Sequence, residues 1–325
     1  MYLDHFGLAQ LPFKITPHTE FFFSGANRGA TLDALIYAIR AGDGLVKVTG
    51  EVGAGKTMLS RVLVERLPES VETIYLAIPS LTRDEILQAI AADLKLKTKT
   101  LNTAGVLERI QQHLIKLHSQ GRQVVVLIDE AHAMPLETLE ELRLLSNLET
   151  NRDKLLQIVL FGQPELDQNL AKPHMRQVKE RITHSFFLQP MPRKDIGEYL
   201  NFRLRAAGYR GPDLFTERCI AMITSVSQGL TRRVNILADK TLLAAYADGA
   251  YNLEPRHVTA AIEDSDFSRP RWWSTALGWV LGSSVAIVVV VVRFGQLRSS
   301  AAKTKRPKQP RRRHADQPAL KISID

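Results

Sequence analysis

The amino-acid sequence predicts an α/β fold in which helices cover both faces of a parallel sheet, followed by a small domain made only of helices. Two observations support this prediction. Between residues 30 and 191, apolar runs typical of buried strands alternate with segments whose apolar residues recur at helical spacing. After Pro192 the apolar runs stop and only helical segments follow. We therefore expect a sheet domain, residues 30–191, and then a separate helical domain.

The sheet domain begins with an amphipathic segment that ends at Gly42. The expected strands are all rich in apolar residues: residues 45–49, 72–78, 123–129, 155–162 and 185–191. The expected helices have apolar residues at a helical period: residues 31–42, 57–67, 82–94, 104–121 and 135–149. Thr82 and Glu85 have the spacing of a capping box, and Gly121 is a typical helix stop. Because most of the strands are near-continuous apolar runs rather than alternating, they are expected to be parallel and covered on both faces.

The helical lid domain is predicted at residues 192–267. Its four expected helices are residues 193–208, 216–229, 230–249 and 254–265, which end at Gly or polar residues. Residues 1–29, rich in aromatic side chains, precede the sheet domain as an N-terminal segment. The single cysteine, Cys219, is expected to pack inside a helix bundle. One cysteine excludes an intramolecular disulfide and fits a reducing compartment.

The positive charge of the chain is concentrated near its end. The formal net charge is +9, but residues 269–325 carry 12 Lys and Arg against two Asp. The first 268 residues therefore have a net charge of −1. This distribution argues against a basic body that binds nucleic acid.

An uncharged apolar segment, residues 272–292, lies within this basic region. Its 21 residues would span about 31 Å as a helix, which matches the hydrocarbon core of a bilayer. Trp272, Trp273 and Trp279 are the aromatic residues expected near a membrane interface. A buried core helix is the alternative, although such helices rarely run this long without a polar stripe. The sequence thus predicts a single transmembrane helix and, at residues 293–325, a basic disordered tail.

The sequence GEVGAGKT joins the first expected strand to a helix and matches the GxxxxGK[ST] pattern of a phosphate-binding loop. Such a loop directs backbone N–H groups and the positive end of the helix toward nucleotide phosphates. Lys56 would reach the β- and γ-phosphates, and the Thr57 hydroxyl would bind Mg²⁺. A glycine-rich turn that binds nothing is the alternative. The predicted nucleotide-binding residues are Gly50, Glu51, Val52, Gly53, Ala54, Gly55, Lys56 and Thr57.

A second acidic motif ends the strand QVVVLID, where Asp129 and Glu130 begin the sequence DEAH. An acid at the end of a strand beside the phosphate loop can hold the water shell of Mg²⁺, which is the role predicted for Asp129. Glu130 would polarise a water molecule for in-line attack on the γ-phosphate. His132 could relay changes at this site or could be an ordinary loop residue. The two motifs together predict binding and hydrolysis of ATP with Mg²⁺.

Further polar residues are candidates for contacts with the γ-phosphate or the attacking water. Gln163 follows a strand, where it could bridge Glu130 and the water or could serve only as a turn residue. Arg232 and Arg233 begin a helix of the lid domain and could contact the phosphate from above.

Two arginines, Arg176 and Arg181, precede the last expected strand. An arginine presented there to the nucleotide of a neighbouring subunit would neutralise charge that develops in the transition state. Solvated helix arginines have the same sequence pattern. We therefore expect either an arginine that acts between subunits or an exposed surface charge.

Together these motifs resemble an AAA+ ATPase of the origin-recognition-like branch. A closer similarity extends over residues 1–267 and the single membrane span: the sequences YLDHFGLAQLPFKITPHTEFFF, GEVGAGKT, DEAH, LFGQPEL and RQVKERI resemble the family of general secretion pathway protein A (ExeA/GspA) and the MSHA pilus biogenesis protein MshM. By position, this resemblance implies that Gln163 is sensor 1, Arg181 the arginine finger and Arg232 sensor 2. Arg176 is the alternative finger.

The resemblance also implies a homo-oligomeric ATPase in the inner membrane of a bacterium, with one span and a cytoplasmic ATPase domain. Its partners would be inner-membrane proteins of a type II secretion system or an MSHA-like type IV pilus, which it would help to assemble. The alternatives are a DNA-transposition or other DNA-handling AAA+ ATPase and a nucleotide switch without hydrolysis. A DNA-handling ATPase does not account for residues 272–292, and Glu130 argues against a switch. Nucleic acid is therefore not an expected partner.

Overall fold

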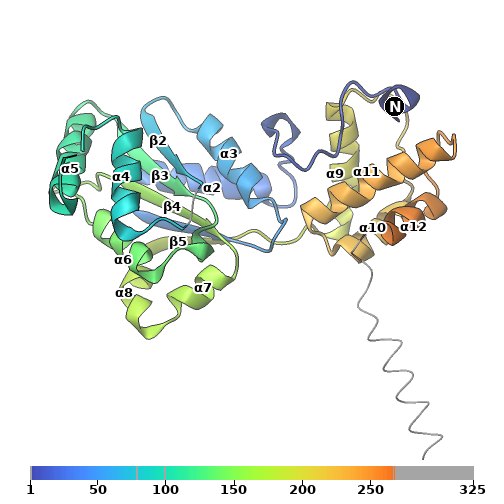
Figure 1. Cartoon of the computed structure of the whole chain (residues 1–325). Helices are drawn as coiled ribbons and strands as arrows, with labels where there is room; N and C mark the ends of the chain where they lie inside the picture. Colours follow the sequence, from blue (N-terminus) through green and yellow to red (C-terminus); the bar gives the residue numbers. More distant parts are fainter. Residues whose placement is uncertain (1, 78–79, 99, 266, 268–325) are drawn as a thin grey trace, which may run out of the picture. The chain divides into compact units, whose positions relative to one another are not determined.

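Five parallel strands form the centre of the sheet domain (Figure 1). The computed structural model describes residues 2–77, 80–98, 100–265 and 267. The strands are β1 (Leu45–Thr49), β2 (Val71–Leu76), β3 (Gln123–Ile128), β4 (Gln157–Gly162) and β5 (Ile182–Phe187). Their order is β2-β3-β4-β1-β5, and all neighbouring pairs are parallel. The parallel sheet predicted from the sequence is confirmed.

Helices cover both faces of this sheet. Consecutive side chains of a strand point to opposite faces, so an apolar inner strand contributes to a hydrophobic layer on each side. In β3, Val124 and Val126 pack into one hydrophobic layer, whereas Val125 and Leu127 pack into the other. The first layer includes α4 (Arg83–Asp93), α5 (Thr103–Ser119) and α6 (Leu136–Leu145), and the second includes α2 (Arg28–Ala41) and α3 (Lys56–Arg66). Four shorter elements complete the domain: η2 (Ala131–Ala133), α7 (Glu165–Leu170), η3 (Pro173–Met175) and α8 (Arg176–Glu180).

The edge strand β5 differs from the inner strands. The inner strands β3 and β4 are buried along almost their whole length, but in β5 half-buried residues alternate with the exposed Thr183, Ser185 and Phe187. An edge strand has a neighbour on one side only, so it tolerates polar residues. The sequence placed this strand at residues 185–191, whereas the structure begins it three residues earlier, at Ile182. Because polar residues alternate with apolar ones at the start of β5, the first residues that pair with β1 do not form an apolar run in the sequence.

Helix ends in the sheet domain follow local signals. The α2 helix stops at Gly42, which adopts a left-handed conformation with φ of 80°. The predicted capping box forms at the start of α4, where the backbone N–H of Thr82 donates to the Glu85 carboxylate at 2.8 Å. Both ends lie where the sequence predicted them.

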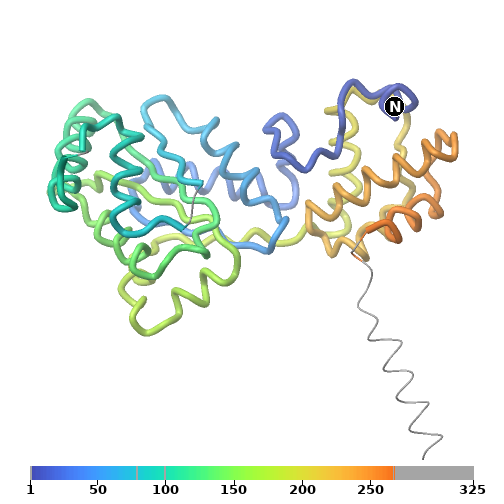
Figure 2. Tube along the Cα trace, in the orientation of Figure 1, coloured from blue at the N-terminus to red at the C-terminus, as the bar shows by residue number. Residues whose placement is uncertain are grey.

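Four helices follow the sheet: α9 (Arg193–Ala206), α10 (Glu217–Ser227), α11 (Thr231–Ala247) and α12 (Pro255–Glu263). Cys219 is buried in their core, as expected. The N-terminal segment contains α1 (Tyr2–Phe6) and η1 (Thr19–Phe21) and runs along the lid helices (Figure 2). Its apolar side chains belong to the core of the lid rather than to a core of their own: Tyr2, Phe6, Leu8, Phe13 and Phe21.

The buried side chain of Arg203, in α9, holds the N-terminal segment against the lid. Its Nε donates to the Pro12 carbonyl at 2.6 Å, and its Nη2 donates to the Lys14 carbonyl at 3.3 Å. Its Nη1 donates to the Tyr199 hydroxyl at 3.0 Å, and the guanidinium lies 4.6 Å from the centre of the Phe21 ring. Burial lowers the pKa of Arg203. The cation therefore depends on these acceptors in place of water.

Replacing Arg203 by Met is expected to destabilise the protein by about 2 kcal/mol, because buried carbonyls of the N-terminal segment lose their donor. Thermal unfolding should register this as a fall in Tm of roughly 4–8 °C. Arg176→Met is the matched control, since Arg176 forms an exposed ion pair with Glu180 and should hardly change Tm. Equal melting temperatures for the two variants would contradict this role for Arg203.

Among the residues that the structure describes, no helix has both the length and the apolar character needed to cross a membrane. The predicted span at residues 272–292 and the predicted tail at residues 293–325 lie outside those residues. Both stay predictions.

Candidate nucleotide-binding site

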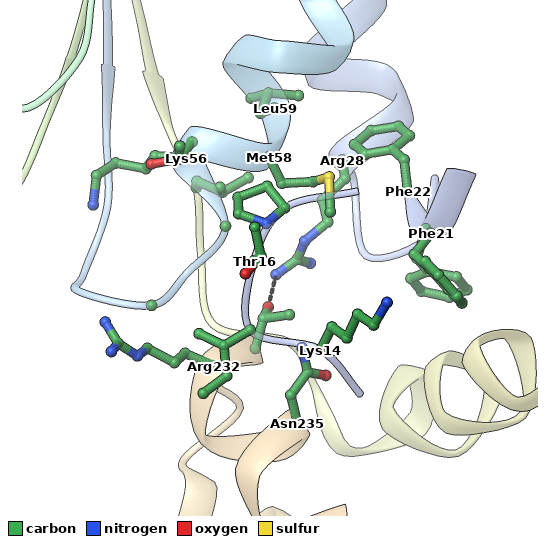
Figure 3. A pocket seen from close by; sticks show the side chains of 18 of the residues that line it. Lys14, Thr16, Phe21, Phe22, Arg28, Lys56, Met58, Leu59, Arg232 and Asn235 are labelled. Carbon is green, nitrogen blue, oxygen red and sulfur yellow. Dashed lines mark hydrogen bonds between the residues drawn. The ribbon is translucent and has the colours of Figure 1, made fainter. Parts of the chain in front are cut away.

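A cavity of about 300 Å³ lies where three parts of the chain meet. These parts are the phosphate loop, residues 50–57, the N-terminal segment and the first turn of α11 (Figure 3). Predicted site residues from separate elements reach this cavity, namely Thr57, Glu130, Gln163 and Arg232. Its volume is at the lower end of the range for small-molecule sites.

The phosphate loop connects β1 to α3, as the sequence predicted. Gly55 immediately precedes α3 and has a φ of 103°, a left-handed conformation that side chains strongly disfavour. The helix can therefore begin at Lys56, so the unpaired N–H groups of its first turn lie beside the loop. From this loop, Val52, Gly53, Gly55, Lys56 and Thr57 line the cavity.

Lys56 is a buried cation within the loop. Its Nζ donates to the carbonyl of Gly50 at 2.8 Å and to the carbonyl of Glu51 at 3.1 Å. Burial lowers the pKa of Lys56, and the negative charges of Glu130 and Asp129 oppose this effect. A dehydrated ammonium group beside the positive end of a helix fits an anionic ligand such as a nucleotide phosphate.

The carboxylate of Asp129, directly after β3, is fixed by two hydrogen bonds. Its Oδ1 accepts from the backbone N–H of Glu130 at 2.9 Å, and its Oδ2 accepts from the Tyr75 hydroxyl at 3.1 Å. The Tyr75 hydroxyl lies 3.3 Å from Ser60 Oγ in α3. Burial raises the pKa of Tyr75, so its hydroxyl remains protonated as a donor.

Asp129 and Thr57 offer the oxygen ligands that Mg²⁺ prefers. In the described part of the chain, no group of three or more His, Cys, Asp or Glu side chains could hold a metal ion. Mg²⁺ is commonly held by one or two protein oxygens together with substrate phosphates and water. The residues present therefore fit a metal ion that arrives with a nucleotide.

Glu130 is the most exposed member of the acidic motif, with 42% of its side chain accessible. It adopts a left-handed conformation, with φ of 53°, at the turn after β3. Gln163 Nε2 donates to Glu130 Oε2 at 3.2 Å, and His132 Nδ1 lies 3.4 Å from the same oxygen. The backbone N–H of Gln163 also points to His132 Nδ1, at 3.4 Å. Gln163 and His132 thus both contact the candidate base, although their roles stay predictions.

Of the two lid arginines, Arg232 is the one at the cavity. Its side chain lines the cavity (Figure 3), and its backbone N–H donates to the Gly53 carbonyl at 3.0 Å. Arg233 instead donates to Gln228 and lies over the Phe267 ring. Arg232 is thus at the cavity, and the sensor role predicted for it stays a prediction.

Arg181 does not join the other candidate residues. It directly precedes β5, and Ile182 pairs with Leu45 at the amino end of β1, whereas the phosphate loop follows the carboxyl end of β1. The length of a strand, roughly 16 Å, therefore separates Arg181 from its own phosphate loop. The Arg181 side chain is exposed and makes no hydrogen bond or ion pair with a described residue, whereas Arg176 pairs with Glu180 at 2.7 Å.

Sequence reasoning missed three contributors to the site. Arg28 and the N-terminal segment line the cavity, and Tyr75 orients Asp129. A tyrosine near the end of the strand beside β3 was a usable signal for Tyr75. Nothing in the local sequence around Arg28 indicates that its side chain contacts the phosphate loop.

Comparison with known proteins agrees with this geometry. The family model of the AAA domain matches residues 39–170. General secretion pathway protein A of Aeromonas hydrophila is 37% identical over 289 residues, which cover 88% of this chain and 53% of that protein. The chain thus spans about half the length of this curated relative.

Two solved structures share the fold. Cdc6p of Pyrobaculum aerophilum matches with a TM-score of 0.62 and 18% identity, over 80% of this chain and 72% of that chain. The ORC2 protein of Aeropyrum pernix, solved as ADPNP and ADP complexes, matches with a TM-score of 0.56 and 16% identity, over 80% of this chain and 74% of that chain. At such identities the likeness shows the fold alone. The AAA-domain match and the Aeromonas relative place the chain in the AAA protein family that includes general secretion pathway protein A.

Proposed function

We propose that this protein binds Mg·ATP in the cavity and hydrolyses it to ADP and phosphate. The observation that carries the proposal is the 3.2 Å contact between Gln163 Nε2 and Glu130 Oε2 at the cavity beside Lys56. Through this contact the candidate base, which follows β3, and the candidate sensor, which follows β4, lie side by side. Fixed polar groups around a phosphate loop are the requirement for phosphoryl transfer to water.

Each residue of the site has a separate proposed role. The N–H groups of the loop and Lys56 hold the phosphates, while Thr57 and Asp129 would hold Mg²⁺. When bound there, Mg²⁺ would supply positive charge to offset the negative charge of the phosphates. Glu130 orients the attacking water and accepts its proton as the new oxygen–phosphorus bond forms and the bond to the bridging oxygen of ADP breaks.

The direct experiment measures phosphate release by the full chain with ATP, in Mg²⁺ and in EDTA. We expect release that requires Mg²⁺ and is the same with and without double-stranded DNA. Strong stimulation by DNA would instead favour the alternative, a DNA-handling ATPase. No release under any of these conditions would contradict the proposed hydrolysis.

Replacing Tyr75 by Phe should raise the Mg²⁺ concentration needed for half-maximal hydrolysis by roughly 10- to 100-fold, the usual effect of losing a hydrogen bond that orients a metal ligand. The reason is that Asp129 Oδ2 loses the donor that orients it. Tyr37→Phe is the control, since Tyr37 is 71% exposed on α2. A Mg²⁺ requirement equal to that of wild type would mean that Tyr75 does not position the metal ligand.

The cellular role is proposed as assembly of a type II secretion system or an MSHA-like type IV pilus at the bacterial inner membrane. The related Aeromonas protein supports the secretion context by its name, and the apolar residues 272–292 support an anchor. Inner-membrane proteins of that machine are the proposed partners. The position of Arg181, far from its own phosphate loop, supports a homo-oligomer in which one subunit completes the site of another.

Two physical arguments disagree on the orientation of the proposed span. Lys and Arg residues are more numerous after residue 292 than just before residue 272, which favours a cytoplasmic tail. ATP hydrolysis, however, requires the folded domain to be in the cytoplasm, and a short basic tail crosses a membrane more readily than a folded domain. We therefore expect residues 293–325 to be periplasmic, where their charge would favour weak, salt-sensitive contacts with anionic partners.

A reporter enzyme that is active only in the periplasm, fused after Asp325, should therefore be active. The same protein carrying a reporter that is active only in the cytoplasm is the control and should be silent. The reverse pattern would contradict this orientation of the span.

A further inference from the structure

Three distant parts of the chain meet at one side of the phosphate loop. Arg28 Nη2, from α2, donates to the carbonyl of Ala54 at 3.1 Å and to the hydroxyl of Thr231 at 3.1 Å. Thr231 is the first residue of α11, and its hydroxyl also lies 3.4 Å from the Ala54 carbonyl. Figure 3 shows the Arg28 guanidinium in the cavity, with its hydrogen bond toward α11 dashed.

A second contact joins the same two elements. The backbone N–H of Arg232 donates to the Gly53 carbonyl at 3.0 Å. A Cβ atom at position 53 would lie only 2.8 Å from the Cβ of Arg232, and Gly53 has a φ of 80°. Glycine at this position therefore allows the first turn of the lid helix to rest directly on the loop.

Burial of the Arg28 guanidinium costs electrostatic free energy, because the cation loses its contact with water. Only 6% of its surface is exposed, and burial lowers its pKa. Among the described residues no carboxylate forms an ion pair with it; its partners are the Ala54 and Ala26 carbonyls and the Thr231 hydroxyl. A buried cation that forms no ion pair lowers the stability of a fold, because its desolvation is not offset by an opposite charge in contact. Its contacts with both the loop and the lid point to a role in the site that they form.

We propose that Arg28 and Thr231 form a latch that holds the first turn of α11 on the carbonyl side of the phosphate loop and thereby directs Arg232 toward the phosphates. The two are positioning residues that act through Arg232, and the proposal rests on the ATP hydrolysis proposed above. In a loop of this kind the N–H groups face the phosphates. The carbonyls of Gly53 and Ala54 instead accept from Arg232 and Thr231 of the lid helix. Ordering of the loop by phosphate is thus transmitted to the lid helix through the same peptide groups.

The latch is tested with Thr231→Val, which keeps the volume of the side chain and removes the hydroxyl. In the full chain this variant should lower kcat by roughly fivefold, as expected for one lost hydrogen bond, and leave nucleotide affinity within about twofold. Thr231→Ser keeps the hydroxyl and should restore kcat. Thr259→Val is the matched control, because Thr259 on α12 also donates to a carbonyl, that of Pro255, but is remote from the cavity.

Coupling to Arg232 distinguishes the latch from a general loss of stability. In an Arg232→Ala background, Thr231→Val should change kcat by less than about 1.5-fold, because the residue through which it acts is gone. Independent effects of the two substitutions on kcat would overturn the proposal. Arg28→Lys should behave like Thr231→Val, since an ammonium group cannot bond both acceptors in the same geometry.

A readout that does not depend on hydrolysis completes the test. Without nucleotide, amide hydrogen exchange in a peptide covering residues 230–237 should be faster in Thr231→Val than in wild type, because the Arg232 N–H bond to Gly53 weakens. Unchanged exchange together with unchanged kcat would overturn the latch. If the wild-type protein releases no phosphate, the proposed hydrolysis fails, and hydrogen exchange alone still decides whether the latch exists.

Discussion

Replacing Glu130 by Gln is expected to leave the affinity for Mg·ATP within about threefold of wild type and to slow hydrolysis by at least about 100-fold. The amide keeps the shape of the side chain but cannot accept the proton of the attacking water, and general-base catalysis commonly contributes 10²–10⁴ in rate. Lys56→Ala should instead lose binding itself, because the buried ammonium of a cavity-lining lysine, which is proposed to hold the phosphates, is removed. Fluorescent-nucleotide titration and phosphate release measure the two effects separately.

Glu137→Gln is the matched control for this pair. It makes the same chemical change on an exposed residue in the first turn of α6 and should alter neither binding nor turnover. An equal loss of affinity in Glu130→Gln and Lys56→Ala would show that Glu130 binds nucleotide rather than activates water. Normal turnover in Glu130→Gln would remove it from the mechanism.

Arg181→Ala is expected to bind ATP normally but to hydrolyse it roughly a thousandfold more slowly, even at high protein concentration. Arg181 lies at the amino end of β5 and cannot reach the phosphate loop of its own subunit, so any catalytic action must be on a neighbour. Mixing Arg181→Ala with Lys56→Ala should restore part of the activity. In the mixture, one composite site combines an intact loop from the first variant with an intact Arg181 from the second.

Arg176→Ala provides the internal comparison for this experiment. Arg176 pairs with Glu180 on the surface of α8, whereas the Arg181 side chain has no such partner among the described residues. We therefore expect Arg176→Ala to retain activity. If Arg181→Ala hydrolyses ATP normally, Arg181 is only a surface charge. If Arg181→Ala is inactive but no ratio of the two variants restores hydrolysis, Arg181 does not act between subunits; if Arg176→Ala is the inactive variant, that residue is the finger.

Local patterns predicted much of this protein because they depend on residues close together in the chain. The strand LVKVT was predicted and found at Leu45–Thr49, and the Thr82–Glu85 capping box formed as its spacing indicated. The phosphate loop was predictable for the same reason, since its glycines and Lys56 act within eight consecutive residues. Asp129 and Gln163 were predictable because parallel strands bring their carboxyl ends to one edge of a sheet.

Other features depend on contacts between residues far apart in the chain. Arg28 and Thr231, 203 positions apart, meet only because the lid helix packs on the phosphate loop. Tyr75 reaches Asp129 because β2 pairs beside β3, and Arg203 reaches Pro12 across 191 positions.

The sequence by itself thus determined the order of the strands and of the main helices, the parallel sheet and the position of the phosphate loop between β1 and α3. Only the tertiary structure decided that the N-terminal segment packs with the lid, that Arg181 lies at the edge of the sheet away from its own site, and that Arg28 bridges the loop and the lid. The physical reason is the range of the interactions. Periodicity, capping and loop conformation are settled within a few residues, whereas burial of an arginine or a tyrosine is settled by which surfaces pack together.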